Sequence, residues 1–206
     1  MIDLHSPDPA IEISIATRGI SKGLTQTDGA QLVVRPEVAF GDIYLGAYAK
    51  NVTSTTSDGE GGPVLGLRTS AGGFNLVASA TGKLSIDPTE GSDPEALELA
   101  GSAARRLGPL NLRLGITWSP DDLGTTGGST WIEGTSTYDL GADFVASAAL
   151  GFRERDGGPD YTAFNVGISR TFFGHLTADI RWYDTDRSAR GDAFEGRLVG
   201  TLRARF

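Results

Sequence analysis

Two histidines, a few acidic pairs and many arginines are the residues of this sequence that could carry chemistry. A serine–histidine hydrolase needs its histidine beside a serine near the substrate, but His5 lies close to the start and His175 adjoins the Phe173-Gly174 turn. Neither histidine has a second one in register, so no histidine metal site is expected. The sequence has no cysteine, which excludes disulfides, thiolate metal sites and a cysteine nucleophile. We therefore expect a non-enzymatic protein with no cofactor and no bound metal.

Paired carboxylates occur at Asp121-Asp122 and at Asp184-Thr185-Asp186. Both pairs fall in polar stretches that are typical of solvated loops, and the calcium-binding loop pattern with its downstream glutamate is not completed. The net charge of −8 and the isoelectric point near 4.7 argue against a nucleic-acid partner, because phosphates require a cationic surface. The acids are thus expected to be loop residues rather than catalytic ones.

The arginines and several acids alternate with apolar residues, so they share one face of extended segments. The predicted pore-lining set is Arg35, Glu37, Arg68, Arg113, Asp179, Arg181, Arg197 and Arg203. Guanidinium groups stay charged at physiological pH, so surplus arginines in a narrow constriction would favour anions. A salt-bridged plug made by the same side chains remains an open alternative.

The elements that position these residues are β-strands, because apolar residues keep a period of two from Ile11 onward. The clearest case runs from Leu110 to Trp118. Twelve strands are predicted, at residues 11–24, 31–40, 43–52, 63–70, 74–86, 96–107, 110–119, 130–140, 142–153, 161–170, 175–184 and 194–206. No run of about 18 apolar residues exists, which excludes a helical membrane protein. Pro36 lies inside the second strand, where it indicates a bulge or a misplaced boundary.

The connections between these strands alternate strictly between tight glycine turns and long polar loops. An even number of antiparallel strands with loops sorted by length is typical of an outer-membrane barrel with short periplasmic turns and long extracellular loops. The six long connections hold 15 acidic and three basic residues. We predict an all-β fold, a transmembrane antiparallel up-and-down barrel of about 12 strands, with residues 1–10 as an N-terminal tail and residues 11–206 as the single barrel domain.

The choice of a membrane barrel over a soluble β-protein rests on the side chains of the two faces. Many alanines and glycines on the apolar face would leave a soluble core underfilled. Aromatic residues gather at strand ends, as the two lipid–water interfaces favour. The predicted interface aromatics are Trp118, Trp131, Trp182 and Phe206. Outer-membrane lipid and lipopolysaccharide are accordingly the expected surroundings, although a soluble barrel remains the alternative.

Three motifs resemble the TorF-type porin family. They are Arg18-Gly19-Ile20-Ser21 followed by Gln26-Thr27-Asp28-Gly29, then Tyr44 to Val52, then Trp182-Tyr183-Asp184-Thr185-Asp186. The motifs come in the family's order and span most of the chain, but Lys50 stands where the family pattern has a serine. The resemblance implies a Gram-negative outer-membrane barrel and provides no substrate or functional residues. The C-terminal Phe206 resembles the signal that the barrel assembly machinery reads.

These observations predict a porin-like channel in the cell outer membrane that passes small hydrophilic solutes by diffusion, with a weak anion preference. Eight-stranded barrels are filled by side chains and barrels of 16 to 18 strands are open, so twelve strands predict a narrow or partly plugged pore. The alternative is a non-conducting structural or binding barrel with acidic surface loops.

Overall fold

The computed structural model describes residues 7–53 and 57–206 of the chain. Within these residues, twelve long antiparallel strands close into one barrel. Their bounds are β1 Asp8–Ala16, β4 Gln31–Phe40, β5 Ile43–Asn51, β6 Gly59–Ala71, β7 Phe74–Ile86, β8 Glu95–Leu107, β9 Leu110–Asp122, β10 Gly127–Gly141, β11 Phe144–Arg155, β12 Tyr161–Phe172, β13 Leu176–Thr185 and β14 Arg197–Arg205. The predicted fold class is confirmed.

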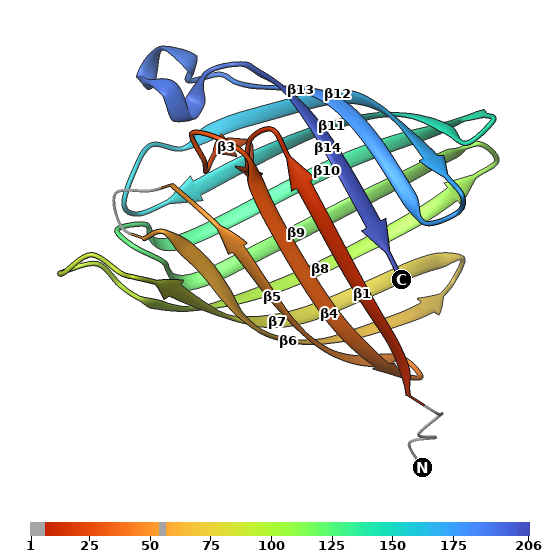
Figure 1. Cartoon of the computed structure of the whole chain (residues 1–206), viewed down its shortest axis with the longest axis horizontal. Coiled ribbons are helices and arrows are strands. Elements are labelled where there is room, and N and C mark those ends of the chain that lie inside the picture. The colour runs from red at the N-terminus through yellow and green to blue at the C-terminus, as the bar shows by residue number, and fades with distance from the viewer. Residues whose placement is uncertain (1–6, 54–56) are drawn as a thin grey trace.

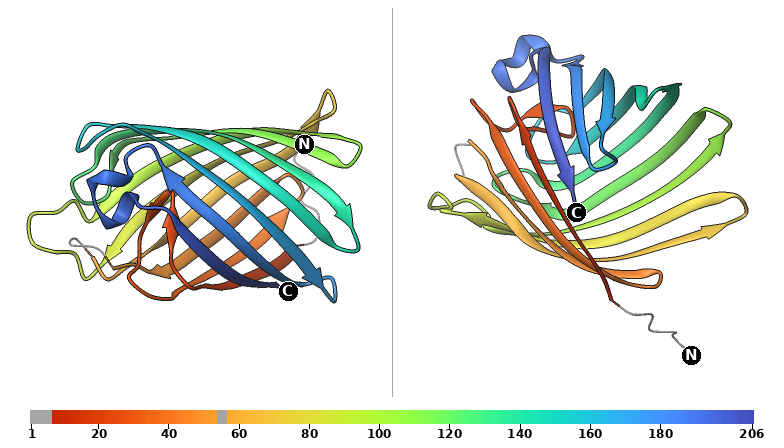
Figure 2. Two further views of the ribbon diagram at one scale, coloured as in Figure 1. Left: turned by 90° about the horizontal axis from the view of Figure 1, so that it is seen from above. Right: turned by 45° about the vertical axis from the view of Figure 1, so that its right-hand side comes forward.

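Each strand pairs with its neighbours in the sequence, and β1 closes the barrel by pairing with β14. At this seam the backbone amides and carbonyls of Ile11 and Phe206 exchange two hydrogen bonds of 3.0 Å. Tight turns lie at the barrel end where β1 begins and β14 ends, and the long connections gather at the opposite end (Figures 1 and 2). No helix of the described residues is long and apolar enough to cross a membrane.

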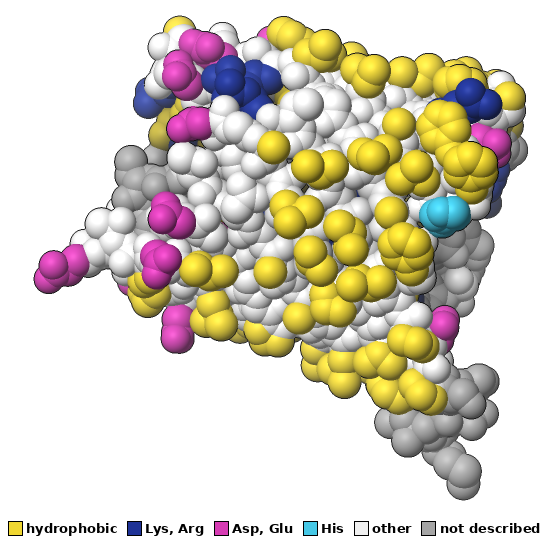
Figure 3. Space-filling model, viewed as in Figure 1, with side chains coloured by type: hydrophobic (Ala, Val, Ile, Leu, Met, Phe, Trp, Pro, Cys, Tyr) yellow, Lys and Arg dark blue, Asp and Glu magenta, His cyan; other side chains and the backbone are white. Residues whose placement is uncertain are grey.

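The apolar face of the strands points outward, as predicted for a membrane barrel. Most of the exposed large hydrophobic residues, such as Leu65, Leu114 and Ile180, alternate along the strands with partly buried lumen residues. Hydrophobic side chains cover the wall in Figure 3, while acidic side chains gather toward the end with the long connections. The described residues therefore form a wall that suits lipid and enclose a polar interior.

Several predicted strand boundaries are wrong, and so is the bulge or misplaced boundary predicted at Pro36. The first strand ends at Ala16, and residues that were assigned to its second half form a small separate hairpin of β2 Ile20–Ser21 and β3 Leu24–Thr25. The last strand begins at Arg197, after the 3-10 turns η1 Ser188–Arg190 and η2 Asp192–Phe194. Pro36 causes no register shift: the β4–β5 ladder is interrupted beside it and resumes in the same register.

Candidate functional site

The β2–β3 hairpin, residues Ile20–Thr25, lies inside the barrel and is called the lumen hairpin below. Lys22 and Gly23 form its turn with φ angles of 49° and 82°. Two successive residues with positive φ are the signature of the type I′ turn that best connects a two-residue hairpin. Gly23 is also required for space, because a Cβ on it would lie 2.2 Å from the Cβ of Ala163 on β12. The hairpin thus projects from the β1–β4 wall into the lumen as far as β12.

Hydrogen bonds hold the lumen hairpin from both sides. The Tyr161 hydroxyl on β12 donates to the Lys22 carbonyl at 2.7 Å, and Arg197 Nε on β14 donates to Thr25 Oγ1 at 3.0 Å. On the other side, Lys50 Nζ donates to the side chain of Gln26, the residue that follows the hairpin, at 2.8 Å. Because these partners come from strands on opposite sides of the barrel, the hairpin spans the lumen instead of lying along one wall.

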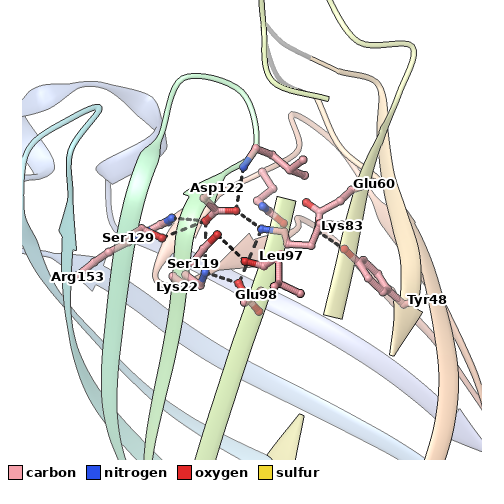
Figure 4. Close-up of polar contacts among 12 residues, drawn as sticks. Lys22, Tyr48, Glu60, Lys83, Leu97, Glu98, Ser119, Asp122, Ser129 and Arg153 are labelled. Atoms are coloured by element: carbon pink, nitrogen blue, oxygen red, sulfur yellow. Dashed lines mark hydrogen bonds and ion pairs between the residues drawn. The ribbon is translucent and has the colours of Figure 1, made fainter. Parts of the chain in front are cut away.

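An ion network joins the lumen hairpin to β7, β8, β9 and β11, and consists of Lys22, Lys83, Glu98, Asp122 and Arg153 (Figure 4). Lys22 Nζ lies 2.6 Å from Glu98 and 3.6 Å from Asp122. Lys83 also pairs with Asp122, and Arg153 reaches the same carboxylate at 2.9 Å. The Asp122 carboxylate is therefore shared by three cations, two of which also lie within 4 Å of Glu98.

Asp122 is the centre of this network and is nearly inaccessible, with 4% of its side chain exposed. Its carboxylate also accepts a hydrogen bond from the Ser129 hydroxyl at 3.2 Å. A carboxylate this buried is tolerable only because cations and hydroxyls surround it. Close by, Lys50 pairs with Glu60 at 3.3 Å, and the Tyr48 hydroxyl donates to Glu60 at 2.7 Å.

Aromatic packing seals the other side of the hairpin. Trp131 of β10 packs with Tyr161 and Ala163, and Leu24 of the hairpin and Phe194 cover them. The Trp131 ring occupies space that a Cβ on Gly151 would fill, at 2.1 Å. The prediction that Trp131 is a membrane-interface residue is wrong, because it points inward in phase with the lumen residues of β10 and is only 8% exposed. The other three predicted interface aromatics, Trp118, Trp182 and Phe206, face outward.

Among the described residues, two cavities lie in the lumen, one on each side of the hairpin. The β4–β9 cavity has a volume of about 580 Å³. Its lining begins at the long connections, with Val52, Ser57 and Thr126, and reaches Tyr44 and Arg68 near the tight turns. It therefore follows almost the whole length of the barrel. Six basic and four acidic side chains line it, so its charge is close to balance with a basic surplus.

At the tight-turn end of the β4–β9 cavity, three side chains form a compact group. Arg68 lies 2.5 and 2.6 Å from the two carboxylate oxygens of Glu37, a bidentate pair. The Arg68 guanidinium also stacks on the Tyr44 ring, 3.8 Å from its centroid. Ion pairing and stacking fix the guanidinium at the tight-turn end of the cavity.

The β10–β14 cavity has a volume of about 450 Å³ and a different lining. Hydroxyl and amide groups dominate it, from residues such as Thr135, Ser147 and Asn165. The hairpin, Trp131 and Ala163 close it toward the long connections, and none of its lining residues among those described comes from the longer connections after β5. The Arg181 side chain lines this cavity, forms an ion pair with Asp179 at 2.9 Å and donates a hydrogen bond to Asn165 at 2.6 Å. This cavity is a pocket that opens toward the tight turns.

The predicted pore-lining residues lie in the lumen but do not form one ring. Arg35, Glu37 and Arg68 line the β4–β9 cavity, and Asp179, Arg181 and Arg203 line the β10–β14 cavity. Arg113 lies 3.8 Å from Glu133, and Arg197 binds the hairpin. Each of the six predicted arginines lies within 4 Å of a carboxylate.

Sequence reasoning missed the hairpin and two of its acidic neighbours. Glu60 and Asp122 were assigned to solvated loops, but both lie on strands with buried side chains. Lys22-Gly23 between two short alternating segments was a hairpin signal in the sequence. His175 packs near Phe173 and Phe206 at the tight-turn end, and His5 lies outside the described residues. No group of three or more His, Asp or Glu suited to a metal ion occurs in the part of the chain that the structure describes.

Solved structures of porins share this architecture. The KdgM porin in complex with disordered oligogalacturonate matches with a TM-score of 0.65 at 10% identity, over 96% of this chain and 99% of that one. The NanC porin matches with a TM-score of 0.63 at 8% identity, over 95% and 97% of the two chains. An outer membrane channel from Pseudomonas putida F1 matches with a TM-score of 0.52 at 11% identity, over 97% and 94%. The fold is that of a porin-like barrel.

Sequence comparisons give no match at the family level. No family model matches the chain, and no curated protein matches it. The resemblance to TorF-type porins therefore stays a prediction, while a porin-like barrel is supported by the structural neighbours.

Proposed function

We propose that this protein is a channel of the Gram-negative outer membrane, through which small hydrophilic solutes diffuse along the β4–β9 cavity. The observation that carries the proposal is a polar cavity that follows almost the whole barrel inside an apolar outer wall. The likeness to porins supports the same function. In this proposal the tight turns and both strand ends of the seam face the periplasm, and the long connections face outward.

Reconstitution of the purified barrel into planar lipid bilayers and liposomes tests the proposal. We expect discrete conductance steps in salt solution and uptake of small sugars and amino acids into the liposomes. Oligogalacturonate, the ligand named with the KdgM porin, is a suitable acidic solute for the panel. Folding is checked by the shift in gel mobility that folded barrels show on heating. A correctly folded barrel with neither conductance nor uptake would overturn the proposal in favour of a non-conducting barrel.

We further propose a weak anion preference, set in the β4–β9 cavity. Arg68 lines this cavity at its tight-turn end and keeps its charge at any physiological pH. Arg181 is the matched control, because it is a paired lumen arginine in the β10–β14 cavity, which the hairpin closes toward the long connections. We expect the anion-to-cation permeability ratio, measured from reversal potentials in a salt gradient, to exceed one. It should fall toward one in Arg68→Gln and stay unchanged in Arg181→Gln. A cation-selective wild type, or equal effects of both variants, contradicts this account.

A further inference from the structure

Two arginines of the barrel point outward from the wall near its tight-turn end. Arg105 on β8 lies opposite Leu112 in the β8–β9 ladder, and Leu112 is 43% exposed on the outer face. Arg170 on β12 is exposed in the same row as Val166 and Ile168. A cation on the lipid face is costly near the bilayer centre and much less so near the interface. The height and contacts of these two arginines therefore decide whether the lipid face can hold them.

Both outward arginines contact aromatic rings instead of acids. The Arg105 guanidinium lies 5.3 Å from the Phe74 ring centroid. The Arg170 guanidinium is near two rings, 4.8 Å from the centroid of Phe144 and 4.9 Å from that of Phe172. Neither arginine forms an ion pair with another described residue, whereas neighbouring Arg106 faces the lumen and pairs with Asp139 at 3.5 Å. The two outward charges are therefore unneutralised by the protein.

The height of these arginines matches the headgroup region of one leaflet. Arg105 precedes the Gly108 turn by three residues and Arg170 precedes Gly174 by four. With a rise of about 3.3 Å per residue and a strand tilt of about 40°, both lie roughly 8–10 Å from the turn tips. Cations at this depth meet lipid phosphates rather than acyl chains.

An apolar groove continues from Arg105 along the outer wall toward mid-barrel. Its volume is about 640 Å³. Small outward residues such as Ala103, Gly134 and Ala148 lie along it, and Leu114 and Leu150 flank them. The groove has the shape and chemistry for an acyl chain, and the cation stands at the end where a headgroup would lie.

We propose that Arg105 and Arg170 bind the phosphates of anionic phospholipids in the periplasmic leaflet, and that the groove beside Arg105 holds an acyl chain of the bound lipid. The phenylalanine rings shield one side of each guanidinium from water, while its N–H groups remain available for a bidentate contact with phosphate. The leaflet follows from the orientation in the proposed function; the binding chemistry does not depend on conduction.

Native mass spectrometry of the folded barrel, released from mixed micelles of phosphatidylglycerol and phosphatidylcholine, tests this proposal. We expect the wild type to retain phosphatidylglycerol severalfold over phosphatidylcholine, and the double variant Arg105→Gln/Arg170→Gln to lose this preference. Arg106→Gln is the matched control, since it removes the neighbouring charge at the same height on the lumen face. It should retain the wild-type preference.

A second variant separates the groove from the charge. Ala148→Leu fills the groove and should weaken retention of the lipid beside Arg105. Arg170 should still bind a lipid phosphate, so the variant should lose only part of the preference for phosphatidylglycerol. Equal phosphatidylglycerol retention by the wild type and the double variant would overturn the proposal. Conductance in pure phosphatidylcholine bilayers should be the same for the wild type and the double variant. A wild-type barrel that conducts but shows no lipid preference would contradict the lipid proposal alone. A wild-type barrel that prefers phosphatidylglycerol but does not conduct would contradict the channel proposal alone.

Discussion

The two sides of the lumen are built from the same alternating pattern but are filled differently. On the β4–β9 side, charged side chains pair across an open cavity of about 580 Å³. On the β10–β14 side, the Trp131 and Tyr161 rings pack under the lumen hairpin and close the cavity toward the long connections. Ion pairs need neighbouring water or further partners to be stable, whereas aromatic rings exclude water. At equal strand geometry, side-chain chemistry therefore decides how each side of the lumen is filled.

Removal of the Asp122 carboxylate should have the largest effect on this arrangement. In Asp122→Ala, Lys22, Lys83 and Arg153 lose their common partner in a buried site. Breaking a buried charge network in this way costs about 3 kcal/mol of unfolding free energy. Urea unfolding of the wild type and the variant in lipid or detergent measures this loss of unfolding free energy.

The neighbouring exposed acid provides the control for that variant. Asp121→Ala should change the unfolding free energy by less than about 0.5 kcal/mol, since surface charges contribute little. Equal effects at both positions would show that the network does not hold the hairpin.

Asp122 also illustrates what the sequence could predict and where prediction stopped. The period of two placed all twelve strands, because each strand has one apolar lipid face and one polar lumen face. The rule fails across a bulge. The β9–β10 register shifts by one residue between Ser119 and Asp122, so the acid turns inward with Ser119 although the two are an odd number of residues apart.

The lumen hairpin was beyond a rule based on strand faces. Its position depends on contacts distant in the sequence, such as those of Lys22 with Glu98 and of Thr25 with Arg197. Trp131, by contrast, could have been placed correctly, because it is in phase with Glu133 on the polar face. The alternation thus indicates the lumen for Trp131, whereas the general preference of tryptophan for interfaces indicates the lipid boundary.

Loss of the Tyr161 hydroxyl should have a moderate effect on the sealed side. Tyr161→Phe removes the hydrogen bond to the Lys22 carbonyl and leaves the ring packing in place. The expected loss of unfolding free energy is about 1 kcal/mol. Tyr138→Phe is the control, because Tyr138 is exposed on the outer wall and should cost nothing measurable. No difference between the two variants would mean that this hydrogen bond does not anchor the hairpin.

Replacing the lumen hairpin should act on conduction, because the hairpin lies between the two cavities and contributes lining residues to both. The backbone N–H of Gln26 donates to the Gly19 carbonyl at 2.7 Å, so these two residues already lie as close as the ends of a tight turn. Two glycines can therefore replace Ile20–Thr25 without moving the flanking chain. The two cavities then merge, and single-channel conductance should rise roughly twofold as the second cavity joins the path. As a control, deletion of Glu90-Gly91 in an exposed connection should leave the conductance unchanged. If the hairpin variant has the same conductance as the wild type, the hairpin does not divide the path.

Cysteine accessibility tests most directly the central claim that solutes pass only on the β4–β9 side. The chain has no cysteine, so single substitutions report one position each. Thr81→Cys lines the β4–β9 cavity and Thr201→Cys lines the β10–β14 cavity. An impermeant, negatively charged methanethiosulfonate reagent should reduce the single-channel conductance of Thr81→Cys and leave that of Thr201→Cys unchanged. Reduction at Thr201→Cys, or no reduction at Thr81→Cys despite complete labelling, would contradict the account.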